Sequence, residues 1–156
     1  MNNVLSYKII KIFPAVCDWI EQQENDIILK GRHLTFNETQ IAKNIGIKNY
    51  DIIKVVESDF VPQPKNKIII ETGLELGLLN KERTNGICFR YGIFINKNAT
   101  NKNLILIHEL IHTLQYEKFG NVEKFLYQYI KECIELGYEN SPLELEAVNK
   151  SKLLYS

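Results

Sequence analysis

Cysteine is scarce in this sequence, and its spacing excludes a disulfide-stapled fold. The 156 residues include only three cysteines, Cys17, Cys88 and Cys133. They are odd in number and far apart, unlike the cysteines of a small secreted domain that disulfides hold together. We therefore expect free thiols and a reducing compartment, the cytoplasm.

Net charge and long apolar runs are also missing. The 19 basic and 19 acidic residues cancel, so no overall field attracts nucleic acid or an anionic membrane, and we do not expect nucleic acid as a partner. The apolar stretch from Val4 to Val16 is interrupted by Lys8, Lys11 and Pro14. We therefore expect neither a signal peptide nor a membrane span.

Hydrophobic residues nevertheless make up 45% of the chain, enough for one sizeable core. A length of 156 residues suits a single domain over 1–156. Periodicity and capping signals predict a helical N-terminal part at about 1–48, strands within about 51–96, and a helical part at about 101–156. The predicted fold class is α+β, with a small sheet of about three strands.

Particular elements follow from local patterns. Apolar spacing predicts a helix over 3–23 that Pro14 kinks or breaks. Capping-box spacing predicts a second helix over 35–46. Runs of β-branched residues predict the strands, which the sequence places at 51–58, 65–70 and 87–95. Three helices should fill the C-terminal part, and their core should contain Leu106, Ile107, Leu110, Ile111, Phe125, Tyr129, Ile130 and Ile134.

The helix predicted from Leu104 onward carries unusual polarity in the string HELIH. His108 and His112 are four residues apart, so they share one helix face with room for an ion between them. Glu109 lies beside the first histidine. Burying these three groups without partners would cost roughly 1–3 kcal/mol for each group. His-Glu-x-x-His on a helix is the arrangement in which two histidines bind zinc and the glutamate acts as general base.

A catalytic zinc site needs a third protein ligand. No histidine or aspartate follows His112, so a downstream ligand must be a glutamate. Glu144 has capping-box spacing from Ser141, which accounts for it. Glu146 falls on the face of the last helix that carries apolar residues, where a carboxylate needs a partner. We predict Glu146 as the third ligand and keep Glu132, which flanks the apolar stripe of its helix, in reserve.

The string HELIH, followed by a long helix and then ELEA, resembles the gluzincin class of zinc metallopeptidases. The resemblance is to small single-domain members called minigluzincins, and it runs over about 91–148. It implies a zincin-like fold, Zn²⁺ bound by His108, His112 and Glu146, and activation of water by Glu109. It thus predicts a zinc metallopeptidase that hydrolyses peptide bonds in a peptide or protein substrate.

Two comparisons within that class bear on the third ligand. The Glu-Ala pair is similar to the CAAX-prenyl-protease group, although that group usually continues with aspartate where this chain has Val148. Thermolysin-like members place the glutamate at a spacing closer to Glu132. The resemblance also implies that the strand at 90–97 forms an edge of the cleft where a peptide can add. Tyr138, just before the last helix, could donate a hydrogen bond to a tetrahedral oxyanion.

Two other functions remain open. The stretch at about 35–57 resembles a helix-turn-helix, with Lys43, Lys48 and Lys54 available for phosphates, and would make this a DNA-binding protein. Alternatively, the zinc site stabilises a binding module that has no catalytic activity.

Overall fold

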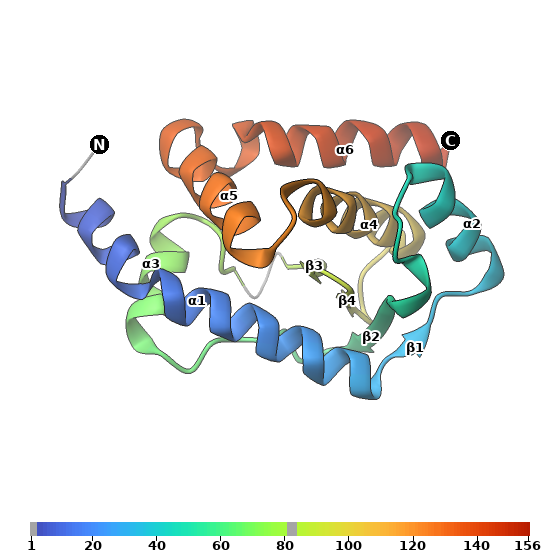
Figure 1. Ribbon diagram of the computed structural model, residues 1–156, viewed down its shortest axis with the longest axis horizontal. Helices are drawn as coiled ribbons and strands as arrows, with labels where there is room; N and C mark the ends of the chain where they lie inside the picture. The colour runs from blue at the N-terminus through green and yellow to red at the C-terminus, as the bar shows by residue number, and fades with distance from the viewer. Residues whose placement is uncertain (1–2, 81–83) are drawn as a thin grey trace.

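Six α-helices and a four-stranded sheet make up the part of the chain that the structure, a computed structural model, describes: residues 3–80 and 84–156 (Figure 1). In chain order they are α1 (Asn3–Lys30), β1 (Arg32–His33), α2 (Phe36–Ile45), the 3-10 turn η1 (Tyr50–Ile52), β2 (Lys54–Ser58), α3 (Lys67–Glu75), β3 (Gly86–Phe89), β4 (Gly92–Asn96), α4 (Lys102–Phe119), α5 (Val122–Leu136), the 3-10 turn η2 (Tyr138–Asn140) and α6 (Pro142–Tyr155). The predicted α+β class is confirmed, and the sheet has one strand more than expected.

The sheet is mixed, with the strand order β1-β2-β4-β3. β2 and β4 pair in parallel, whereas β3 and β4 form an antiparallel hairpin. β4 is therefore internal, and β3 lies at the edge of the sheet. The prediction that the strand at 90–97 forms the edge of the cleft is wrong in this respect, because β4 is internal and the edge strand beside it is β3.

The hairpin also corrects the prediction of one strand over 87–95. Arg90 and Tyr91 form a turn in the middle of that run, and Arg90 has a φ of 61°. Residues other than glycine rarely adopt this left-handed backbone conformation. The carboxylate of Glu24 on α1 holds the turn, accepting hydrogen bonds from the Arg90 guanidinium and from the Tyr91 N–H. A contact 66 residues away in the chain thus fixes a turn that the local sequence does not indicate.

Two other predictions about local structure are wrong. Residues 65–70 do not form a strand, because Asn66 caps α3 by accepting hydrogen bonds from Ile68 N–H and Ile69 N–H. The cap outweighs the β-branched residues that follow it. The first helix is neither broken at Pro14 nor limited to residue 23; α1 continues through Pro14 to Lys30.

The region of the predicted helix-turn-helix contains only one of the two helices. α2 has the expected capping box between Thr35 and Glu38 and ends at Gly46 in a left-handed conformation. The chain then forms η1 and enters β2 at Lys54. The residues required for a recognition helix are therefore part of the sheet.

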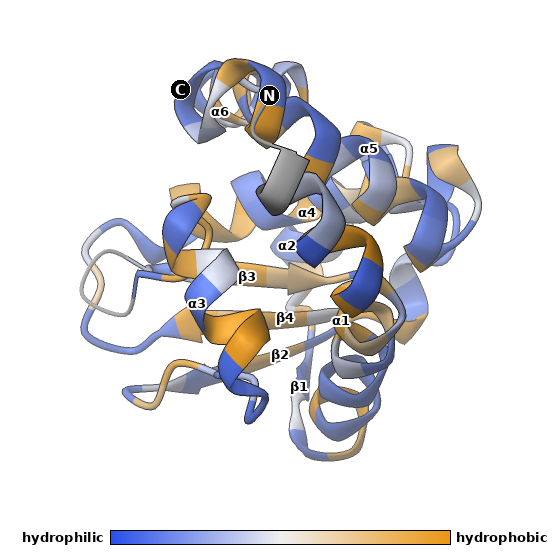
Figure 2. Cartoon of the chain, turned by 90° about the vertical axis from the view of Figure 1, so that its left-hand side faces the viewer, coloured by the Kyte–Doolittle hydropathy of each residue, from blue (hydrophilic) through white to orange (hydrophobic). Residues whose placement is uncertain are grey.

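The sheet separates two groups of buried side chains. Ile93 and Ile95 of β4 pack in a cluster with Leu106 and Leu110 of α4. Phe94, which points to the other face, packs in a cluster with residues of α1 and α5. Figure 2 shows β3 and β4 as largely hydrophobic strands with helices around them. α4 is covered by the sheet on one side and by α6 along its length (Figure 1). Polar side chains on α4 are therefore positioned by contacts with these neighbouring elements.

The predicted core is largely confirmed. Six of its members are buried, namely Leu106, Ile107, Leu110, Ile111, Phe125 and Ile130, while Tyr129 and Ile134 are partly exposed. In the described parts of the chain no helix is both long and apolar enough to cross a membrane.

Candidate metal centre

The two histidines of the HELIH string lie on one face of α4 and turn toward each other. Their Nε2 atoms are 3.0 Å apart. The side chain of His108 is 20% exposed and that of His112 only 7%. Two ring nitrogens this close, on a helix buried among apolar residues, could both bind one metal ion.

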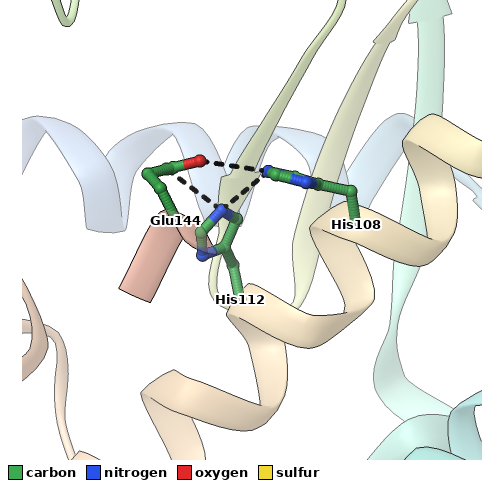
Figure 3. A group of neighbouring side chains, drawn as sticks. All are labelled: His108, His112 and Glu144. Atoms are coloured by element: carbon green, nitrogen blue, oxygen red, sulfur yellow. Dashed lines mark hydrogen bonds and ion pairs between the residues drawn. The ribbon is translucent and has the colours of Figure 1, made fainter. Parts of the chain in front are cut away.

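Glu144, in the first turn of α6, completes the group (Figure 3). Its Oε2 atom lies 3.3 Å from Nε2 of His108, and its Oε1 atom lies 3.2 Å from Nε2 of His112. The ligand atoms of all three residues lie within 4.8 Å of one another and could hold a metal ion. Burial raises the pKa of the Glu144 carboxyl, but hydrogen bonding with both histidines outweighs it and holds the pKa well below the usual range. Glu144 is therefore a carboxylate, as a metal ligand must be.

Glu146, the predicted third ligand, lies elsewhere. Its Oε2 atom accepts a hydrogen bond from Gln115, and its Oε1 atom pairs with Lys150 and lies 3.7 Å from Lys118. The reserve candidate, Glu132, is also engaged elsewhere. The structure therefore brings Glu144 to the two histidines in place of either predicted residue.

The reason lies in the start of α6. Ser141 does cap the helix by accepting from the N–H of Glu144, but the reciprocal half of a capping box is missing. The N–H of Ser141 is already bonded to the carbonyl of Tyr138, which leaves the Glu144 side chain free to reach α4. Glu132 takes its place at the corner, accepting from the Ser141 hydroxyl and the Leu143 N–H. The spacing of Ser141 and Glu144 therefore gives only one of the two hydrogen bonds of a capping box, and it does not exclude Glu144 as a ligand.

Two residues that sequence reasoning missed hold the group in position. Tyr129 on α5 donates a hydrogen bond to Oε1 of Glu144. Gln115, one turn beyond His112 on α4, accepts a hydrogen bond from Nδ1 of His112 over 2.8 Å. Its amide nitrogen donates to the carbonyl of Leu143 and to Glu146. The only feature of the sequence that could have indicated Gln115 as a partner of His112 is its position three residues further along the same helix.

This contact determines the protonation of the His112 ring. Both partners of the Gln115 amide nitrogen are acceptors, so the amide oxygen must face His112. Nδ1 of His112 then donates its proton to Gln115, which leaves Nε2 as the ring nitrogen available to a metal ion beside His108 and Glu144. Metal-binding histidines are commonly oriented in this way by a second hydrogen bond.

Glu109 lies beside the group but is not part of it. It is only 6% exposed. Burial raises the pKa of its carboxyl to about 7, with the charge of His108 opposing and that of Glu144 adding to the shift. A backbone hydrogen bond from Cys88 in β3 lowers the pKa and partly offsets this shift. A carboxyl whose pKa is near 7 is suited to accept and return protons at neutral pH.

Tyr138 lies in η2 and is 38% exposed. Burial of its ring and the charges of Glu144 and Glu109 raise its pKa above the usual range, so its hydroxyl keeps its proton. Tyr138 lines one cavity together with His108, Glu109 and Glu144. The structure thus brings the predicted residues of the site to one place, with the exception of Glu146.

Comparisons with protein families, with curated proteins and with solved structures found no match to this chain. Function is therefore inferred from the geometry of the site and from general chemistry.

Proposed function

We propose that this protein is a zinc-dependent peptidase, with His108, His112 and Glu144 as the zinc ligands. The observation that carries the proposal is the convergence of these three side chains on one point beside a cavity. Two imidazoles and one carboxylate are a common ligand set of catalytic zinc, which keeps a further position open. In a purely structural role, apolar side chains would fill these buried positions without the cost of burying a carboxylate and two imidazoles.

The chemistry would be divided between the ion and the chain. When bound, zinc supplies a Lewis acid that polarises a carbonyl and lowers the pKa of a water molecule. Glu109 accepts the proton of the attacking water and delivers it to the leaving amine. Tyr138, which remains protonated, donates a hydrogen bond to the oxygen that becomes negative in the transition state. Both residues line the cavity that contains the ligand group.

The substrate backbone would lie along β3. Asn85 accepts a hydrogen bond from Asn96 on the β4 side, so its neighbour Gly86 directs its N–H and C=O away from β4. A Cβ on Gly86 would lie 2.6 Å from Oε1 of Glu109. A peptide bonded to this edge would therefore pass directly beside the proposed general base.

The metal is tested with a matched pair of variants on α6. Glu144→Gln and Glu146→Gln make the same change two residues apart. Elemental analysis after dialysis should find stoichiometric zinc in the unmodified protein and in Glu146→Gln, and little in Glu144→Gln. Zinc retained in Glu144→Gln but lost in Glu146→Gln would restore the original ligand assignment.

Catalysis is tested separately with an unfolded protein such as casein. The zinc-loaded protein should hydrolyse it, and Glu109→Gln should keep zinc while hydrolysis falls to background. A zinc-loaded protein that cleaves no peptide bond would instead be the non-catalytic binding module.

A further inference from the structure

The cavity that contains the ligand group extends well beyond it. Its volume is about 590 Å³, within the range of roughly 300–1,000 Å³ that is usual for ligand pockets. Residues of α1, α3 and α5 form apolar walls of the cavity, among them Ile12, Phe13, Val16, Ile69 and Leu126. Figure 2 looks at this side of the molecule and shows hydrophobic stretches on both α1 and α3.

These walls are apolar over a large area. In the described part of the chain, α1, α3 and α5 contribute no charged side chain to the cavity. The charged residues come from α4, η2 and α6, where the ligand group lies. Apolar surface of this kind binds water weakly and favours apolar side chains. The charged groups of the cavity thus come from the same side as the ligand group.

One polar group in the apolar walls has no partner. Thr72 on α3 is 3% exposed, lines the cavity, and its hydroxyl makes no hydrogen bond within the described residues. Leaving a buried hydroxyl unpaired costs roughly 1–3 kcal/mol. Because less than 1 Å² of the hydroxyl oxygen is exposed, a bound molecule could reach it only if the wall of the cavity shifted.

The strand beside the cavity also favours a peptide. Gly86, Ile87 and Cys88 of β3 line it, and β3 pairs only with β4 among the described strands. An extended peptide can bond to the outward main-chain groups of Gly86 on such an edge. A hydrocarbon chain offers no donor or acceptor for these groups.

We propose that the cavity binds consecutive large apolar side chains of a peptide that lies along the outer edge of β3. The enzyme would therefore select apolar segments, of the kind that folded proteins bury, and would discriminate against polar ones. This selectivity rests on the proposed peptidase function, because it concerns the same site.

The test compares two fluorescein-labelled peptides of equal length that differ only in a central Leu-Phe-Leu or Ser-Asn-Ser. Binding to zinc-loaded Glu109→Gln, which does not turn the peptide over, is followed by fluorescence polarisation. We expect the apolar peptide to bind at least about tenfold more tightly. Equal affinities would overturn the proposal, as would displacement of the apolar peptide by dodecanoate at lower concentration than by its unlabelled copy, which indicates a lipid site.

A cavity variant locates the binding. Val16→Trp on α1 fills part of the cavity without adding charge, and it should abolish most of the preference. Ile10→Trp on the same helix is the control, because Ile10 is 74% exposed. An unchanged preference in folded Val16→Trp would place the apolar peptide elsewhere. The peptide comparison itself needs no cavity variant, so misfolding of Val16→Trp does not affect it.

Failure of the peptidase function would look different. Zinc content and casein hydrolysis are measured on the unmodified protein. Selective binding of the apolar peptide without hydrolysis would support the peptide-binding cavity and contradict the peptidase function. Hydrolysis of both peptides at equal rates and with equal affinities retains the enzyme and removes the selectivity.

Discussion

Gln115 and His112 share a hydrogen bond of 2.8 Å in which the histidine is the donor. Because the amide of Gln115 is held by Leu143 and Glu146 on α6, the orientation of the His112 ring depends on the packing of α6 against α4. Glu146, the residue predicted as a ligand, is thus connected to the site by a hydrogen bond from Gln115 that a glutamine at position 146 could still accept.

Removing this hydrogen bond should weaken metal binding without removing a ligand. In Gln115→Leu we expect zinc affinity to fall by about 10- to 100-fold, measured by competition with a chromophoric chelator. In the zinc-free protein, nitrogen chemical shifts of the His112 ring should also show that Nδ1 has lost its hydrogen-bond acceptor. Gln22→Leu, at an exposed position on α1, should alter neither quantity.

Zinc should stabilise the fold in proportion to its concentration. Binding to the folded chain alone adds about 2.7 kcal/mol at a free concentration 100 times the Kd, which raises the Tm by several degrees. EDTA should reverse the shift. Glu144→Gln should show little zinc-dependent change in Tm, whereas Glu146→Gln should behave like the unmodified protein. An equal shift in both variants would mean that zinc binds elsewhere.

Gly86 is the position where a small change should affect catalysis but not the metal. In Gly86→Ala the new Cβ would lie 2.6 Å from Oε1 of Glu109 and 2.7 Å from Ile105. Displacing a general base by about 1 Å can lower the rate by about 100-fold, so kcat should fall strongly at unchanged zinc content. Full activity would show that Glu109 is not the general base in this position.

The ion pair between Arg90 and Glu24 should contribute strongly to stability. Its N–O distance is 2.6 Å, and the Glu24 side chain is 3% exposed. In Arg90→Ala a buried carboxylate would lose its partner, which typically costs about 3–5 kcal/mol. Urea unfolding would measure this loss. The surface pair of Lys8 and Glu75, with side chains 46% and 49% exposed, is the control: Glu75→Gln should change stability by less than about 0.5 kcal/mol.

Glu117 should make stability depend on pH in the acid range. Partial burial raises the pKa of its carboxyl, but hydrogen bonds from the N–H groups of Lys48 and Asn49 outweigh it, and the pKa lies below the ordinary value of 4.5. The folded state therefore favours the carboxylate. Its stabilising contribution is complete above pH 4.5 and is lost as the pH falls through the lowered folded-state pKa.

Comparison with Glu117→Gln isolates this group from other carboxyls. The difference in unfolding free energy between the two proteins should be about 1 kcal/mol at pH 7 and should shrink toward pH 3. A difference that stays constant over this range would contradict the assignment.

Short-range signals in the sequence predicted the elements that short-range contacts determine. The caps at Thr35 and Ser141 mark the starts of α2 and α6 in the structure, because a cap needs only three or four neighbouring residues. The histidine pair on α4 is equally local, since helix geometry alone brings the two rings together.

Features that depend on distant contacts were missed. The turn at Arg90 needs Glu24 from α1, and the choice of Glu144 over Glu146 depends on how α6 lies against α4. Rotating a helix by two residues turns a side chain through roughly 200°. A decision between two glutamates two residues apart therefore needs the packing of the helices, which the sequence pattern does not contain.

The ligand group also has an order of assembly. His108 and His112 face each other as soon as one turn of α4 forms, whereas Glu144 reaches them only after α5 and α6 have folded back over the 31 residues between His112 and Glu144. In a refolding experiment, the first event is local and fast, and the second must overcome the loop-closure entropy of that segment. Binding of an ion that needs all three side chains would therefore report when the C-terminal helices close over α4.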